Sequence, residues 1–213
     1  CTYKSLSHTT ARRTATTQGV RIASMPMITE DIINRTLAVD YARIRTRSRA
    51  LHTYVAAARN IHITTACGTD VTFTRGARTV YHGNGGIFNT KGAFGNLPEG
   101  EVTFSPATTD GVFIVDASFP LVGKVESPLR FEVTQGIVTA ITGTHADRIH
   151  EALDAVGPAA YRIAELGIGT NEYATIIGNV LEDEKVLGTC HIAVGNDMSY
   201  GGTNNVPLHL DGV

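Results

Sequence analysis

The C-terminal end of the chain carries the side chains whose types and spacing best suit chemistry. His209 and Asp211 are separated by one residue, and in a β-strand such residues point to the same face, so an imidazole and a carboxylate would face one point. His191 precedes them in an apolar segment at 190–194, and a polar, glycine-rich loop at 196–205 connects the two. Neutral histidine together with aspartate suits zinc, iron, cobalt or manganese. The alternative for so short a motif is a pair of solvent-exposed strand residues.

Two glutamates could complete a metal site of this kind. Glu101 and Glu165 each lie between a glycine-containing turn and an apolar stretch, where an unpaired ionised carboxylate would be costly to bury. Metal coordination would remove that cost. An exposed strand edge is the alternative for Glu101, and a buried ion pair is the alternative for Glu165. Glu184 belongs to the acidic run 182–184, which predicts a solvated surface.

Other catalytic classes find little support in the sequence. No serine occupies a Gly-x-Ser-x-Gly turn, and the glycines at 167–169 lack the pattern of a dinucleotide site. The sequence around Cys67 and Cys190 matches no motif of a thiol nucleophile, so this class is not supported. The remaining histidines lack a spacing that convergent ligands require. His82, beside a glycine-rich loop, comes nearest, but a structural position is the preferred interpretation.

Composition excludes several classes of partner. The 213 residues are 42% hydrophobic and 18% charged, which is ordinary for a globular protein with a substantial core. A net charge of −2 gives no basic surface for nucleic acid. No apolar run approaches the roughly 20 residues of a membrane-spanning helix, so we expect no membrane partner. Three scattered cysteines and the lack of a signal-like segment predict a cytoplasmic protein.

The two ends of the chain indicate a piece of a longer protein. The sequence begins at Cys1 without a methionine, and it stops at Val213, directly after the His-x-Asp motif. We therefore expect a chain that is truncated at both ends.

Helix and strand signals divide the chain near residue 60. In residues 1–60, a helix ending before Gly19, a short strand at 20–23 and a helix at 40–58 predict the remainder of an N-terminal α/β domain. In residues 61–213, short strands with turns at close intervals predict a larger, mainly antiparallel β domain with flanking helices, which would bind the metal. The fold class expected for the whole chain is therefore mixed α/β.

Three local elements of the second part are specific enough to compare with a structure. Residues 70–74 and 79–82 alternate around Arg75 and Gly76, which predicts a β-hairpin. A second hairpin is expected around Gln135 and Gly136. Asn171 can cap a helix that runs to about residue 179.

Five segments occur in an order that resembles one family of peptidases. They are Asn96-Leu97-Pro98-Glu99-Gly100-Glu101-Val102, Ala164-Glu165-Leu166-Gly167-Ile168-Gly169-Thr170-Asn171, residues 181–185, Gly188-Thr189-Cys190-His191-Ile192-Ala193-Val194-Gly195 and His209-Leu210-Asp211. Further matches lie at 5–9 and 21–26, so the resemblance covers essentially the whole chain. In this succession the sequence resembles the aminopeptidase T family, the leucyl aminopeptidase-like dinuclear metallopeptidases.

This resemblance implies a cytoplasmic, homodimeric exopeptidase that acts on peptides and holds two divalent metal ions, such as zinc, cobalt, manganese or magnesium. The ligands carried over by the resemblance would be Glu101, Glu165, His191, His209 and Asp211. The family also uses a tyrosine after the first histidine, for which Tyr200 is the candidate. A loop aromatic that packs locally is the alternative for Tyr200.

The reaction that the resemblance implies is hydrolysis of the N-terminal peptide bond. Two metals roughly 3.5–4 Å apart would bridge a water molecule and lower its pKa. Glu165 could act as a general base instead of a ligand. Tyr200 would donate a hydrogen bond to the tetrahedral oxyanion.

A second enzyme class fits part of the same residue set. His191, His209 and Asp211 form the two-histidine, one-carboxylate set of non-haem iron oxygenases. An iron-dependent dioxygenase that cleaves the ring of 2,5-dihydroxypyridine is similar in fold to aminopeptidase T, and it would use a single Fe(II) with Glu101 and Glu165 behind the ligands. A binding protein that kept the fold without the chemistry is a third interpretation.

Overall fold

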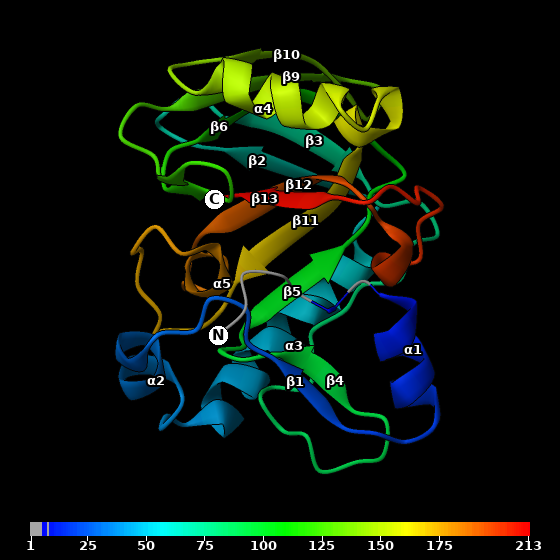
Figure 1. Ribbon diagram of the computed structural model, residues 1–213, viewed down its shortest axis with the longest axis vertical. Coiled ribbons are helices and arrows are strands. Elements are labelled where there is room, and N and C mark those ends of the chain that lie inside the picture. The colour runs from blue at the N-terminus through cyan, green and yellow to red at the C-terminus, as the bar shows by residue number, and fades with distance from the viewer. Residues whose placement is uncertain (1–5, 8) are drawn as a thin grey trace.

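A four-stranded antiparallel sheet in the middle of the molecule carries the residues predicted to bind metal (Figure 1). The computed structural model describes residues 6, 7 and 9–213, so the motif at 5–9 lies partly outside the described residues. The strand order in this sheet is β13-β12-β11-β5. The strands are β5 (Glu101–Phe104), β11 (Ile163–Gly169), β12 (Cys190–Gly195) and β13 (His209–Gly212).

A five-stranded antiparallel sheet, in the order β10-β9-β6-β3-β2, shares one hydrophobic core with the first sheet. Buried and exposed residues alternate along β9, as a strand with one face in a core requires. Phe113 and Phe131 stack in this core with their ring centroids 4.6 Å apart, and burying each ring stabilises the fold by about 2 kcal/mol. The strands are β2 (Asn60–Thr64), β3 (Asp70–Thr74), β6 (Thr108–Val115), β9 (Leu129–Thr134) and β10 (Ile137–Thr142).

The helices α3 and α4 lie against the two large sheets. The helix predicted at 40–58 is confirmed as α3 (Tyr41–Ala57), which is capped by Asp40 and lies against β5. α4 (Ala146–Asp154) lies against β10 and buries Ile149 and Leu153 in the core (Figure 1). No helix in the described part of the chain is both long enough and apolar enough to cross a membrane.

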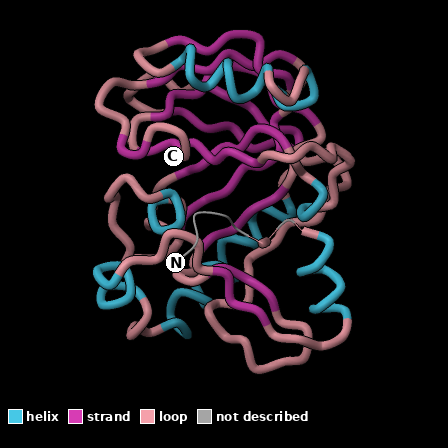
Figure 2. Tube along the Cα trace, in the orientation of Figure 1, coloured by secondary structure: helices cyan, strands magenta, loops and turns pink. Residues whose placement is uncertain are grey.

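The mixed α/β class is confirmed, because helices and short strands also surround the two large sheets (Figure 2). β1 and β4 pair in parallel, although they lie on opposite sides of residue 60 in the sequence. The expected division at that residue stays a prediction. The remaining elements are α1 (Thr10–Thr17), β1 (Ile22–Ser24), α2 (Glu30–Thr36), β4 (Phe94–Asn96), β7 (Ser118–Phe119), β8 (Gly123–Lys124), α5 (Val180–Asp183) and the 3-10 helices η1 (Pro158–Tyr161) and η2 (Met198–Tyr200).

One predicted hairpin is confirmed and the other is wrong. β9 and β10 pair around Gln135 and Gly136 as expected. β3, in contrast, pairs with β2 on one side and with β6 on the other, which leaves no free edge for residues 79–82. Tyr81 instead exchanges backbone hydrogen bonds of 2.8 and 2.9 Å with Thr103 at the edge of the four-stranded sheet. Pairing between distant strands overrides the local turn signal here.

The helix expected from Asn171 to about residue 179 is also wrong, because residues 171–179, which the structure describes, form turns and irregular backbone instead. The Asn171 side chain accepts a hydrogen bond from the Tyr173 N–H and donates one to the Glu99 carbonyl oxygen. It therefore fixes a turn against the loop before β5 rather than starting a helix. The short helix α5 begins after Asn179, which supplies its N-cap.

Candidate metal centre

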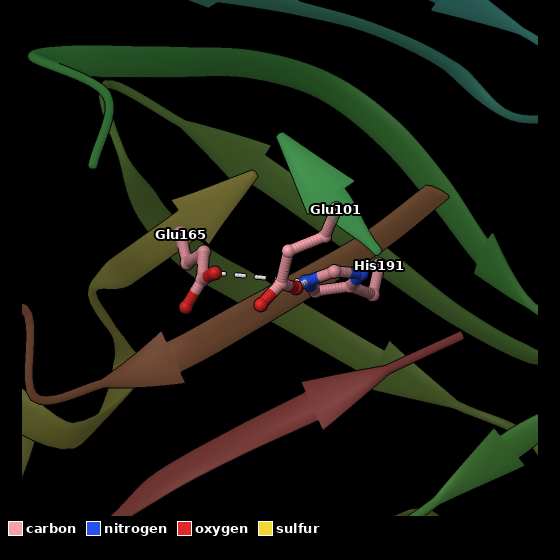
Figure 3. A group of neighbouring side chains, drawn as sticks. All are labelled: Glu101, Glu165 and His191. Atoms are coloured by element: carbon pink, nitrogen blue, oxygen red, sulfur yellow. Dashed lines mark ion pairs between the residues drawn. The ribbon is translucent and has the colours of Figure 1, made fainter. Parts of the chain in front are cut away.

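The five predicted ligands lie on one face of the four-stranded sheet. Along β12, the side chains of Ile192 and Val194 point into the core. His191 directly precedes Ile192, so its side chain points to the opposite face of the sheet. The same alternation places Glu101 on that face of β5 and Glu165 on that face of β11. Figure 3 shows the side chains of these two glutamates converging with His191 from three adjacent strands.

His209 and Asp211 reach the same face from β13, the next strand of the sheet. The backbone register pairs Asp211 with Ala193 and His209 with Gly195, both on β12. The pair therefore lies directly beside the strand that carries His191. All five side chains are buried or nearly so, with exposed side-chain fractions of 15% or less.

Close contacts connect the two imidazoles to three carboxylates. His191 Nε2 lies 3.2 Å from Glu101 Oε2 and 3.5 Å from Glu165 Oε1. His209 Nε2 lies 3.0 Å from Glu165 Oε2 and 3.3 Å from Asp211 Oδ1. Glu165 thus lies between the two imidazoles, and Thr103 donates a hydrogen bond to its Oε1.

The orientation of the His209 ring is set by the backbone. Its Nδ1 lies 2.7 Å from the carbonyl oxygen of Asn196, an acceptor, so Nδ1 carries the proton. In neutral His209 the Nε2 lone pair then faces two carboxylate oxygens, an arrangement that needs a cation between them. A histidine held by its far nitrogen in this way is typical of metal ligands.

The donor set fits a divalent cation. Glu165 Oε2 is buried and has no aligned hydrogen-bond donor among the described residues, although His209 Nε2 is close. Three overlapping groups of side chains place their ligand atoms within 4.8 Å of one another. They are Glu101 with Glu165 and His191, Glu165 with His209 and Asp211, and Glu184 with His191 and Asp211.

The pKa values of the two imidazoles reflect the carboxylates that surround them. Burial alone would lower the pKa of His191 and His209, but the neighbouring carboxylates outweigh burial and raise both values well above the ordinary one. Burial would raise the pKa of Glu165, but its contacts with the two imidazoles hold that pKa well below its usual range. A bound divalent cation would replace these protons.

The acidic run 182–184 is not the solvated surface that the sequence predicts. Glu182 is fully buried. Arg35 donates two hydrogen bonds of 2.7 Å to it, from Nε to Oε1 and from Nη2 to Oε2. Asp183 accepts hydrogen bonds from the backbone N–H groups of Ile177 and Gly178. Glu184 lies at the centre itself, where burial raises its pKa to about 7. Glu184 in turn pairs with Lys185. Each carboxylate of the run therefore has its own partner, and that compensation makes burial of the run tolerable.

A cavity of about 450 Å³ opens beside the centre. Glu101 and Thr103 form part of its wall, together with Tyr200 from the loop at 196–205. The Tyr200 ring lies 5.8 Å from the His209 ring and 6.2 Å from the ring of Tyr81. The predicted site residue Tyr200 is therefore placed between the centre and the cavity.

Sequence reasoning missed several residues that shape the cavity and the centre. Thr103 was detectable, because it lies two residues after Glu101 on the same strand face. His82 lines the cavity although the sequence predicted no functional position for it. Glu99 holds the glycine-rich loop on the cavity wall by accepting hydrogen bonds from the N–H groups of Gly85 and Gly86. Lys185 is buried against the centre, although the acidic run beside it predicted a solvated surface.

Fold and cluster together place a candidate metal-binding site on one face of an antiparallel sheet within an α/β protein. The chain belongs to the family of 2,5-dihydroxypyridine 5,6-dioxygenases (NicX), whose family model matches residues 1–212. No curated protein matches the chain.

Solved structures share the fold. The chain is similar to 2,5-dihydroxypyridine dioxygenase from Pseudomonas putida KT2440, with 20% identity and a TM-score of 0.80 over 96% of this chain and 62% of that one. It is also similar to wild-type AmpT from Thermus thermophilus, with 18% identity and a TM-score of 0.62 over 86% of this chain and 51% of that one. The chain thus spans about three fifths and one half of the lengths of these two proteins.

The prediction of an aminopeptidase, and hence of a hydrolase, is wrong. The family match over residues 1–212 identifies the dioxygenase family, and aminopeptidase T is a more distant structural relative. The error has a physical cause: a cluster of histidines and carboxylates binds metals for hydrolytic and for oxidative chemistry alike. A metal cofactor agrees with the family and with the cluster of ligand types, and the predicted pair of ions is not confirmed.

Proposed function

We propose that this chain forms the iron centre of a dioxygenase that cleaves the ring of 2,5-dihydroxypyridine or a closely similar dihydroxylated N-heteroaromatic compound. The observation that carries the proposal is the family match over residues 1–212, and the cluster of histidines and carboxylates supports it. In the reaction that gives the family its name, the bond between ring carbons 5 and 6 breaks. Each of these two carbons gains one oxygen atom from O₂.

One ferrous ion would be held by His191, His209 and Asp211, with Glu165 between the two imidazoles as a further oxygen donor. Two histidines and one carboxylate leave coordination positions open for substrate and O₂ in non-haem iron oxygenases. Bound iron would supply the electron transfer that allows O₂ to react with an aromatic ring. The contact from His209 Nδ1 to the Asn196 carbonyl oxygen keeps the other nitrogen directed at the centre.

The neighbouring cavity suits a flat, polar ring. Tyr81, Tyr200 and Phe94 contribute aromatic surface to its wall, and Arg12 lies 4.1 Å above the Phe94 ring. Aromatic walls favour stacking with a planar ligand. The guanidinium group of Arg12 can bind an ionised ring oxygen.

Two cavity residues can handle protons of the substrate. Burial raises the pKa of Tyr200 well above its ordinary value, and the nearby carboxylates add to the effect, so its hydroxyl remains a neutral donor. Burial lowers the pKa of His82, so its imidazole is neutral near pH 7 and can accept a proton from a ring hydroxyl.

The test is oxygen uptake by iron-loaded protein. Purified protein would be loaded with ferrous iron without air and mixed with 2,5-dihydroxypyridine and isotopically labelled O₂. The expected result is uptake of one O₂ for each substrate and a product, seen by mass spectrometry, that contains both labelled atoms. Iron-loaded protein that leaves the substrate unchanged would contradict the proposal.

A pair of histidine variants controls for indirect effects. His209→Ala should lose iron and turnover, because its imidazole contacts two carboxylates of the centre. His62→Ala should retain both, because His62 is 56% exposed and pairs with Asp70 on the five-stranded sheet.

A further inference from the structure

Lys185 is a buried cation at the edge of the metal centre. Its side chain is 1% exposed, and Nζ lies 2.6 Å from Glu101 Oε1 and 2.6 Å from Glu184 Oε1. The other oxygen of Glu101 faces His191 Nε2 at 3.2 Å. Glu101 is therefore shared between the ammonium group and the imidazole of a proposed ligand.

The carboxylates of the centre are numerous enough to hold more than one divalent cation. Glu101, with Glu165 and His191, forms one possible ligand group, and Glu165 also belongs to the group with His209 and Asp211. A carboxylate that belongs to two groups is the usual bridge between two metal ions. The ligand types alone would therefore allow a dinuclear centre.

The ammonium group changes that balance, because it already pairs with two of the carboxylates and places one positive charge between them. A second divalent ion beside Glu101 would have to lie close to the Lys185 charge, and like charges repel strongly where water is excluded. Lysine also donates hydrogen bonds to both carboxylates, so these oxygens are satisfied without a metal.

We propose that Lys185 takes the place of a second metal ion and thereby makes the centre mononuclear. The inference rests on the proposed metal centre but not on its substrate. Lys185 acts here as a positioning residue, since it contacts two carboxylates of the centre and holds them away from a second cation. If Lys185 had only a structural role, it would connect the segment after α5 to β5. Replacing it would then leave the number of bound metal ions unchanged.

The test starts from metal-free protein, titrates it with Mn²⁺ and measures how many ions bind. Wild-type protein should bind about one equivalent, and Lys185→Met, which keeps the length of the side chain but removes its charge, should bind about two. Electron paramagnetic resonance separates the two states, because neighbouring Mn²⁺ ions couple magnetically whereas a single ion does not. Added Mn²⁺ should also raise the melting temperature of Lys185→Met more than that of the wild type.

Two further variants keep the test decisive. Lys185→Arg retains the charge and should still bind about one equivalent. Glu101→Gln should also retain one bound ion with an affinity within about tenfold of the wild type, because Glu101 serves Lys185 rather than the metal. If Lys185→Met does not fold, Lys185→Gln, which also removes the charge, takes its place and should bind about two equivalents.

Each contrary outcome has its own meaning. Two equivalents in the wild type, one equivalent in folded Lys185→Met, or loss of the metal in Glu101→Gln would overturn the role of Lys185 while leaving a metal centre in place. No bound metal in the wild type would overturn the proposed centre and the role of Lys185 together. Failure of the oxygen-uptake test with a normal metal count would affect only the proposed reaction.

Discussion

Gly167 and His191 face each other across β11 and β12, and a β-carbon on Gly167 would overlap the imidazole ring. The ring occupies the space that any other residue at position 167 would fill. Glu165, two residues earlier on the same strand face, is thereby left within 3.5 Å of the imidazole. A glycine in the middle of a strand has a positional reason here, since it permits close approach of a functional side chain.

Replacing this glycine should damage the centre. Gly167→Ala would push the His191 ring away from Glu165, and we expect at least about a tenfold loss of metal affinity and about 1–3 kcal/mol of stability from overpacking. Metal titration and chemical denaturation measure the two effects. Gly95→Ala is the control, because its β-carbon would meet only the edge of Phe88 at 3.3 Å. Equal metal affinity in both variants would contradict the role assigned to Gly167.

Arg35 has a buried and an exposed partner, and its ion pair with the buried one should contribute far more to stability. Arg35 contacts Glu182, which is fully buried, and Asp31, whose side chain is 71% exposed. Arg35→Ala leaves a buried carboxylate unpaired and should cost about 3 kcal/mol, whereas Asp31→Ala should cost about 0.5 kcal/mol or less. Urea denaturation of the two variants gives the comparison. Similar losses would show that Glu182 finds another partner.

Stability of the metal-free protein should fall on both sides of a pH optimum. The raised pKa values of His191 and His209 stabilise the fold fully below about pH 6.5, the unfolded value, and this contribution is lost as the pH rises through the folded values. The lowered pKa of Glu165 stabilises the fold above about pH 4.3, the unfolded pKa. This stabilisation is lost as the pH falls through the folded pKa.

Metal should change this profile in a defined direction. A divalent cation competes with the imidazole protons, so its affinity should rise with pH. Melting temperatures measured across pH with a chelator and with Mn²⁺ should therefore diverge toward alkaline pH. Parallel curves would exclude metal binding through these histidines.

Removing one hydroxyl group should separate substrate binding from metal binding. Tyr200→Phe keeps the ring beside His209 but loses the neutral donor, and we expect kcat/KM for 2,5-dihydroxypyridine to fall about tenfold, equivalent to about 1.4 kcal/mol. The number of bound metal ions should stay unchanged. Tyr54→Phe is the control, since Tyr54 is 76% exposed on α3. A loss of metal in Tyr200→Phe would instead make Tyr200 part of the centre.

The sequence was sufficient for five members of the cluster but not for Glu184, and not for the class of reaction. His209 and Asp211 share a face because β-strands repeat every two residues, and this alternation is visible without a structure. The reaction assigned to the cluster was wrong, because the same donor atoms serve hydrolases and oxygenases. The family match overturned the peptidase assignment.

Alternation along single strands and the helical periodicity of residues 40–58 are properties of neighbouring residues, and the sequence by itself determined them. The tertiary structure alone decided the burial of the run at 182–184, the position of Lys185 between two carboxylates, and the strand that Tyr81 joins. The physical reason is that these outcomes depend on partners far along the chain. Arg35, which makes burial of Glu182 possible, is 147 residues away in the sequence, and no local pattern records such a pairing.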